Sequence, residues 1–147
     1  MLVGIVNMVK NIKKIHPEFV ICYKVGNFYN TYGGSAFIIS YLFGYKIRNI
    51  EQNMTVVGFP KKAISKVIAR LEKEKINYLI IDTRNNYDVD NKCDNGNLNK
   101  YQTVLEKAHK EINIKRRIDK ITEILTKEKD INKIKRIEEI IYESRKV

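Results

Sequence analysis

The segment with the clearest chemical potential spans residues 23–30 and reads Tyr-Lys-Val-Gly-Asn-Phe-Tyr-Asn. Its β-branched and aromatic residues favour strands, and Gly26-Asn27 favours a tight reversal between two of them. Such a reversal would hold Phe28 and Tyr29 near a tip and out of the core. An aromatic ring there can stack on a nucleic-acid base or wedge between base steps. The alternative is that strand alternation directs Phe28 into the core.

A large positive charge accompanies this segment. The 147 residues include 28 Lys and Arg against 17 Asp and Glu, a net charge of +11. Residues 1–82 contribute +7 of this surplus and residues 98–147 contribute +5, while residues 83–97 contribute −1. Such a surplus attracts polyanions, nucleic acid first, although a proteome rich in Lys, Ile and Asn would produce it too. The candidate phosphate contacts are Lys24, Lys61, Lys62 and Lys66.

Catalytic and cofactor-binding patterns are absent from the sequence. No glycine is followed by lysine, so there is no ATP-binding loop, and the seven glycines never take dinucleotide-binding spacing. His16 and His109 have no evident triad partner. Three aspartates between residues 88 and 94 lack the final glutamate of a calcium loop. Cys22 and Cys93 make neither a disulfide framework nor a metal site. We therefore expect no enzymatic activity, no cofactor and no metal.

The elements that must position these residues follow from periodicity and turn signals. The pattern predicts helices at 2–15, 36–43 and 61–75, and strands at 19–25, 28–32, 45–50, 54–59 and 76–81, with a turn at 51–53. Residues 83–97 consist almost entirely of turn formers and predict a polar loop. Two antiparallel helices, separated near residues 127–130, are predicted for the remainder.

This order indicates an α/β (mixed α+β) fold, in which a mixed β-sheet is flanked by helices. We expect three parts: a domain at 1–82, a polar loop at 83–97 and a helical hairpin extension at 98–147. No apolar run approaches the roughly 18–20 residues that span a bilayer, and the N-terminus lacks the features of a secretory signal. We therefore expect a cytoplasmic protein that does not bind membranes.

Several motifs within residues 6–82 together resemble a known family. They are His16-Pro17-Glu18 after the first helix, the segment from Tyr23 to Tyr29, and Val57-Gly58-Phe59-Pro60 before a long helix and a closing strand. In this arrangement the chain resembles the N-terminal mismatch-recognition domain (domain I) of MutS-type DNA mismatch-repair proteins. The resemblance leaves residues 98–147 unexplained.

The resemblance implies a mixed sheet surrounded by helices, and a role for particular residues. In the family, the phenylalanine of a Phe-x-Glu motif stacks on a mispaired base, and the glutamate hydrogen-bonds that base. Phe28 matches the stacking position and Tyr29 the middle one, but Asn30 stands in place of the glutamate. An amide cannot carry a carboxylate's charge. We therefore expect nonspecific duplex binding to be retained better than mismatch readout.

The predicted function is a DNA-binding module, without ATPase activity, that binds duplex or distorted DNA. The nucleic-acid-binding residues would be those named above: Phe28, Tyr29, Asn30, Lys24, Lys61, Lys62 and Lys66. RNA binding by the same surface stays open. A second alternative is an accessory or protein-interaction subunit, in which residues 98–147 dock a partner or a second copy of the chain and mismatch recognition has been lost.

Overall fold

The chain folds into two compact units, Met1–Ile112 and Asn113–Val147. The structure, a computed structural model, describes residues 2–50, 53–84, 86–96 and 99–146. Each unit is described by itself.

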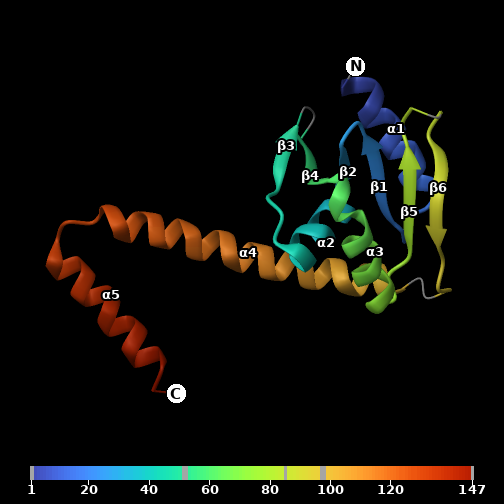
Figure 1. The fold of residues 1–147 in the computed structure, drawn as a ribbon. Helices are drawn as coiled ribbons and strands as arrows, with labels where there is room; N and C mark the ends of the chain where they lie inside the picture. The colour runs from blue at the N-terminus through green and yellow to red at the C-terminus, as the bar shows by residue number, and fades with distance from the viewer. Residues whose placement is uncertain (1, 51–52, 85, 97–98, 147) are drawn as a thin grey trace. The chain divides into compact units, whose positions relative to one another are not determined.

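The first unit is built on a six-stranded mixed sheet with the strand order β3-β4-β2-β1-β5-β6 (Figure 1). Only β1 and β5 run parallel, and every other neighbouring pair is antiparallel. The strands are β1 (Val20–Val25), β2 (Phe28–Tyr32), β3 (Arg48–Ile50), β4 (Met54–Pro60), β5 (Tyr78–Asp82) and β6 (Asp88–Cys93). The observed architecture confirms the predicted α/β class.

Helices cover the two faces of this sheet and produce two separate apolar clusters. Helix α1 (Leu2–Ile15) packs Val9 onto the face that carries Tyr23, Tyr32 and Leu79. The opposite face is covered by α2 (Gly34–Phe43), α3 (Ile64–Lys73) and the first part of α4 (Asn99–Lys127). Because successive strand residues point to opposite faces, the buried apolar residues of β1 and β2 are divided between the two clusters.

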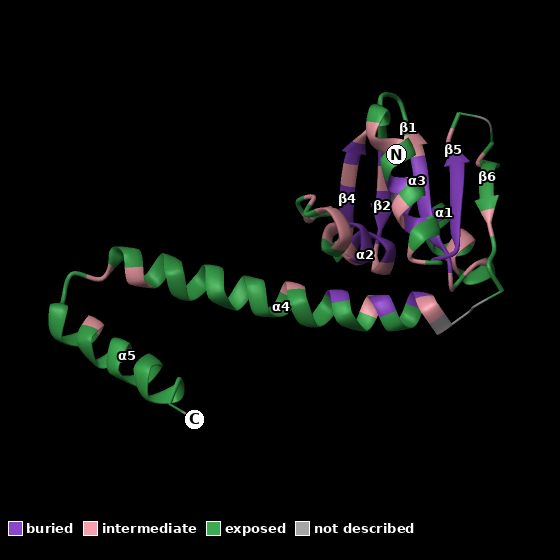
Figure 2. Cartoon of the chain, turned by 60° about the horizontal axis from the view of Figure 1, so that its bottom comes forward, coloured by how far each residue is buried: buried purple, intermediate pink, exposed green. Residues whose placement is uncertain are grey.

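Helix α4 completes the core of the first unit. Tyr101, Val104 and Ala108 are buried, whereas burial ends beyond this part of the helix (Figure 2). The Tyr101 hydroxyl lies 3.3 Å from Ser35 Oγ near the start of α2. This packing explains why the first compact unit runs to Ile112 and does not end near residue 82.

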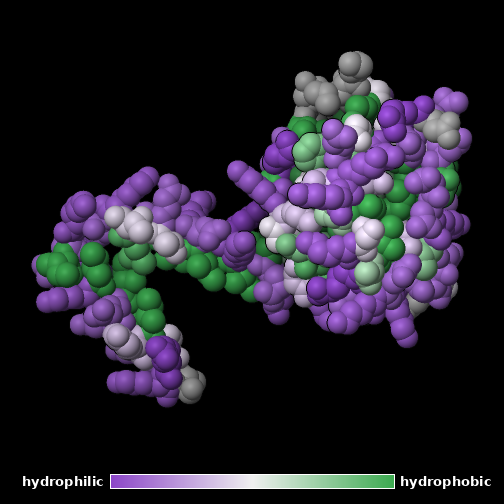
Figure 3. Space-filling model, in the orientation of Figure 1, coloured by the Kyte–Doolittle hydropathy of each residue, from purple (hydrophilic) through white to green (hydrophobic). Residues whose placement is uncertain are grey.

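The second unit contains the rest of α4 and α5 (Ile131–Ser144). Asp130 caps α5, accepting a hydrogen bond of 2.9 Å from the Asn132 backbone N–H, as predicted by the break near residues 127–130. Large apolar side chains are exposed along both helices, and Figure 3 shows this green apolar surface between purple charged groups. Their packing as a hairpin stays a prediction. No helix among the described residues has the length and apolarity needed to cross a membrane.

Three element predictions need correction. The loop predicted at 83–97 contains strand β6, which pairs with β5 through a bulge at Ile80/Ile81. Because β6 is an edge strand with mostly exposed side chains, it lacks the apolar alternation that signals a strand. The strand predicted at 45–50 is limited to Arg48–Ile50, and the helix predicted at 61–75 begins as a 3-10 turn, η2 (Lys61–Ala63), before α3. Of the turn predicted at 51–53, residues 51 and 52 lie outside the described residues.

Candidate nucleic-acid interface

The site begins at the tight turn between β1 and β2. Val25 pairs with Phe28 across it, and the two residues between them are Gly26 and Asn27. Gly26 has a φ of 61°, a left-handed conformation that glycine adopts without steric cost. The Lys61 backbone N–H donates a 2.8 Å hydrogen bond to the Asn27 carbonyl, which ties the turn to the end of β4. The predicted reversal is therefore confirmed.

The two aromatic residues that follow the turn have opposite environments. Phe28 is 54% exposed, whereas Tyr29 is 5% exposed. The Tyr29 ring stacks on Phe59 with a centroid distance of 5.6 Å, and Phe59 stacks on Tyr45 at 5.8 Å. The expectation that Tyr29 would stay out of the core was wrong, because strand alternation turns it toward α2 and α3. The same alternation directs Phe28 outward.

Phe28 borders a hollow of about 530 Å³ on the α1 face of the sheet, here called the Phe28 hollow. It is lined by two apolar residues, a glycine, an amide and two cations: Val25, Phe28, Gly58, Asn30, Lys46 and Arg48. None of the described residues that line it is acidic. An exposed ring beside two cations and an amide is a combination that suits base stacking together with phosphate contact.

Gly58 makes room for the Asn30 side chain. These residues pair across β2 and β4, and a Cβ on Gly58 would lie 2.8 Å from Asn30 Oδ1 and 3.6 Å from Arg48 Nη2. The Asn30 amide nitrogen donates to the Tyr32 hydroxyl at 3.4 Å. Burial raises the pKa of Tyr32, so this hydroxyl stays protonated at neutral pH. Asn30 is thus oriented across the floor of the Phe28 hollow.

The predicted lysines fall into two groups. Lys61 and Lys62 are exposed and line a shallow hollow with Asn27 and Pro60, beside the turn that carries Phe28. Lys66 lies on the opposite face of the sheet, with its amine 5.6 Å from the ring centre of Tyr45. The structure therefore brings Lys61 and Lys62 close to Phe28 but separates Lys66 from it.

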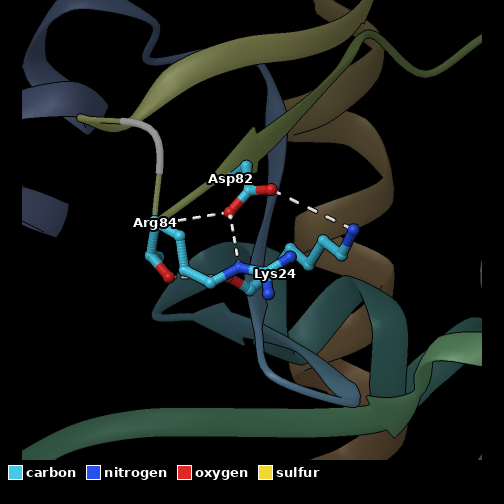
Figure 4. A network of polar contacts seen from close by, with 4 residues as sticks. Lys24, Asp82 and Arg84 are labelled. Atoms are coloured by element: carbon cyan, nitrogen blue, oxygen red, sulfur yellow. Dashed lines mark hydrogen bonds and ion pairs between the residues drawn. The ribbon is translucent and has the colours of Figure 1, made fainter.

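Lys24 also lies on the face opposite Phe28. Its amine is 4.0 Å from a carboxylate oxygen of Asp82, which also pairs with Arg84 at 3.6 Å (Figure 4). Hydrogen bonding from the Arg84 backbone N–H, followed by the nearby cations, lowers the pKa of Asp82. Asp82 is therefore ionised at neutral pH and offsets part of the positive charge of Lys24.

Two cations of the Phe28 hollow were not among the predicted site residues. Lys46 and Arg48 stand two positions apart within the strand predicted at 45–50, a spacing that places both on one face. The sequence does not give the register that aligns Arg48 with Val56 and brings it beside Gly58. Without that register, the strand spacing alone cannot connect them to Phe28.

The described residues contain no other arrangement with evident reactive chemistry. No group of three or more His, Cys, Asp or Glu side chains among them could hold a metal ion. Cys22 is fully buried, and burial raises the pKa of its thiol to about 12. A thiol with so high a pKa is not a nucleophile at neutral pH.

Comparison with known families identifies one match. The family model described as MutS domain I matches residues 3–127, which is most of the chain. The match extends past the motifs that end near residue 82 and takes in helix α4. A search of curated proteins found no match.

Proposed function

The chain belongs to the MutS domain I family, and we propose that it is a DNA-binding module that engages duplex or distorted DNA through the Phe28 hollow. This domain is the non-catalytic part of MutS, and no ATPase domain is found in the chain. Family membership suggests DNA mismatch binding in general terms. The residues and the mode of contact are our proposal.

The observation that carries the proposal is the exposure of Phe28 at the rim of a cationic hollow. Full burial of a phenylalanine side chain contributes about 1.5–3 kcal/mol, and Phe28, which is 54% exposed, forgoes roughly half of that free energy. A nucleic-acid base would cover this ring, and base–aromatic stacking contributes about 1–3 kcal/mol per base. By the motif resemblance, Phe28 matches the family's stacking position, and its exposed setting supports the proposed role.

Electrostatics around Phe28 favour a polyanion. Lys46 and Arg48 line the hollow, and Lys61 and Lys62 extend the positive surface around the turn. We assign phosphate contacts to these four residues. Lys24, paired with Asp82, and Lys66, on the far face, would act only through long-range attraction, and Tyr29 would support the turn from within the core.

Asn30 determines how selective this module is. Its amide can donate or accept a hydrogen bond at a base edge, but it carries no charge. The absence of a carboxylate beside two cations leaves the hollow more positive than the family pattern would. We therefore propose strong binding to any duplex, with a smaller preference for mismatched over matched DNA than a Phe-x-Glu member would show.

Arg48→Gln tests the electrostatic part of this proposal. Its affinity for a duplex is measured by fluorescence anisotropy at several salt concentrations, with Lys133→Gln in the second unit as the matched charge control. Loss of one phosphate contact should lower the salt dependence of log K by about one unit of slope and weaken binding. An equal effect of both substitutions would refute a defined contact at Arg48.

RNA of equal length serves as competitor in a separate titration of the intact protein, and preference for RNA would redirect the proposal to that ligand.

A second candidate function rests on the exposed apolar side chains of the second unit. On α5, Ile131, Ile140, Ile141 and Tyr142 are all more than half exposed, and with Ile134 and Ile137 they extend over more than half of the helix circumference. A two-helix hairpin would cover only one side of so wide a face. We propose that a second copy of the chain covers the other.

Charge complementarity supports this pairing. Residues 115–120 of α4 include four basic residues and one acid, whereas residues 138–143 of α5 include three glutamates and no basic residue. Antiparallel packing of α4 from one copy on α5 from another would bring these segments together.

Sedimentation equilibrium of the intact chain and of Ile118→Lys/Ile121→Lys tests this pairing. We expect a dimer that the double substitution dissociates. A monomeric intact chain at high concentration would contradict this candidate.

A further inference from the structure

A second hollow lies on the α1 face of the sheet, between that helix and the first part of β1, the end of β2 and Met54. Its volume is about 680 Å³, within the range of small-molecule sites. We call it the α1 hollow. It shares Tyr32 with the network around Asn30, because the Tyr32 hydroxyl accepts the Asn30 hydrogen bond.

One wall of the α1 hollow is cationic. Helix α1 contributes Lys10, Lys13 and Lys14, together with two asparagines, and the lining contains no acid within the part of the chain that the structure describes. Lys13 is already engaged, since its amine donates to the Phe19 carbonyl at 3.0 Å and lies 3.8 Å from the ring centre of Tyr101. Lys10 and Lys14 are exposed. These two supply the charge available to an anion.

The remaining lining is apolar and aromatic. It includes Ile21, Tyr23, Tyr32 and Met54. The Tyr23 hydroxyl is buried and has no hydrogen-bond partner among the described residues, which is costly for a polar group. A ligand matching this lining has a flat apolar body with a polar edge at one end and an anionic group at the other.

We propose that the α1 hollow binds a nucleoside monophosphate unit, with the base against Tyr32 and Met54 and the phosphate at Lys10 and Lys14. The unit is a free nucleotide or a nucleotide of a DNA strand held at the Phe28 hollow. The choice of a nucleotide over other amphipathic anions rests on the proposed DNA-binding function, because both hollows lie on the same sheet face and are linked by the hydrogen bond from Asn30, which lines the Phe28 hollow, to Tyr32, which lines the α1 hollow.

Met54 provides a local reporter for this site. It lines the α1 hollow, whereas Met8, a partly exposed residue of α1, does not. With methyl-¹³C-methionine in the intact chain, titration with deoxyadenosine monophosphate should shift the Met54 signal in a saturable manner and leave Met8 unchanged. Inorganic phosphate and deoxyadenosine should each need at least about tenfold higher concentration, because each supplies one of the two contacts.

Matched variants separate a specific site from general charge attraction. Lys10→Gln/Lys14→Gln should weaken the nucleotide-dependent Met54 shift by about tenfold. Lys133→Gln/Lys135→Gln, which removes the same charge from α5, should not. A Met54 signal that does not move, or that moves equally in both double variants, would overturn the proposal. Decanoate, an amphipathic anion without a base, is the ligand control, and saturation of the Met54 shift by decanoate at the same concentration as by the nucleotide would overturn the proposal too.

Two further experiments distinguish a free nucleotide from a nucleotide of a strand, and distinguish failure of this site from failure of the proposed DNA-binding function. If the unit belongs to a strand, a 5′-phosphorylated oligonucleotide shifts Met54 at lower concentration than the mononucleotide does; the reverse order indicates a free nucleotide. The Phe28→Ala variant should keep the mononucleotide shift. A saturable Met54 shift without any duplex binding would show that the proposed DNA-binding function fails while the α1 hollow still binds nucleotides.

Discussion

At the scale of single residues, strand alternation decides which side chains can meet DNA. Phe28 and Asn30 share a face with Lys46 and Arg48, whereas Tyr29 points into the core. The exposure of Phe28 is therefore a property of its register position after a two-residue turn. One added residue in that turn would exchange the roles of Phe28 and Tyr29.

Gly58→Ala tests how the Phe28 hollow positions Asn30. The new methyl group would lie 2.8 Å from Asn30 Oδ1, so the amide must move, and a movable side-chain end can do so without unfolding the sheet. We expect DNA affinity to fall by about three- to tenfold with little change in the melting temperature. Gly4→Ala, where a Cβ meets nothing within 4 Å, is the control. Unchanged affinity in Gly58→Ala would show that the position of Asn30 does not matter.

Lys13 predicts a pH dependence of stability. Burial lowers the pKa of its amine to about 8, from an ordinary value of 10.5. Between these values the folded protein has released a proton that the unfolded chain still holds, so the free energy of unfolding rises with pH. Relative to Lys13→Met, the intact protein should gain stability between pH 8 and pH 10, as measured by urea denaturation. A constant difference over this range would contradict the lowered pKa.

At the scale of elements, the start of α2 and the first part of α4 approach each other closely. A Cβ on Gly34 would lie 2.7 Å from the Tyr101 hydroxyl and 3.3 Å from Leu105 Cδ2. Tyr101 is buried, so its ring cannot easily move away. A side chain at position 34 would therefore force Tyr101 or Leu105 to shift.

A double-mutant cycle measures the Gly34–Tyr101 contact. Gly34→Ala should destabilise the protein by about 1–3 kcal/mol through overpacking. Tyr101→Phe removes the hydroxyl, so Gly34→Ala should cost less in that background. Chemical denaturation of the four proteins provides the free energies. Additive effects would mean that the hydroxyl is not what the methyl group meets.

The sequence predicts the helices and strands better than it predicts the strand register and helix placement that bring their residues together. The β1–β2 turn, the long amphipathic α3 and the two C-terminal helices each have local signals: a Gly-Asn pair, a 3.6-residue period, and a break near residue 128. Strand β6 has none, because it is polar and held only by pairing with β5. Strand register places Arg48 beside Phe28 and Lys24 on the opposite face, and helix placement puts Lys66 on that opposite face too. Both are nonlocal properties and leave no short-range pattern in the sequence.

At the scale of the whole molecule, positive charge is carried by both units. Residues 1–112 have 17 basic and 10 acidic residues, and residues 113–147 have 11 and 7. The second unit thus holds a net +4 of the total +11. It contributes to long-range attraction of a polyanion, while the Phe28 hollow belongs entirely to the first unit.

Truncation separates these contributions. Residues 1–112 retain Tyr101, Val104 and Ala108, so this fragment should keep a melting temperature close to that of the intact chain. Residues 1–97 lack these three buried side chains and should unfold at a much lower temperature, as circular dichroism would show. The 1–112 fragment should also bind DNA with a smaller salt dependence. If 1–97 were as stable as 1–112, α4 would not be part of the core.

The central claim is that Phe28 stacks on a base, and the affinity of Phe28→Ala for a mismatched duplex tests it most directly. Ile15→Ala is the control, because Ile15 is exposed at the end of α1 that precedes β1, at the opposite end of that strand from the turn. By fluorescence anisotropy at two salt concentrations, we expect Phe28→Ala to lose about 1–3 kcal/mol of binding free energy. Its salt dependence should stay unchanged, because no charge is removed, and Ile15→Ala should bind as the intact protein does. Equal affinity of the intact protein and Phe28→Ala would contradict base stacking by Phe28.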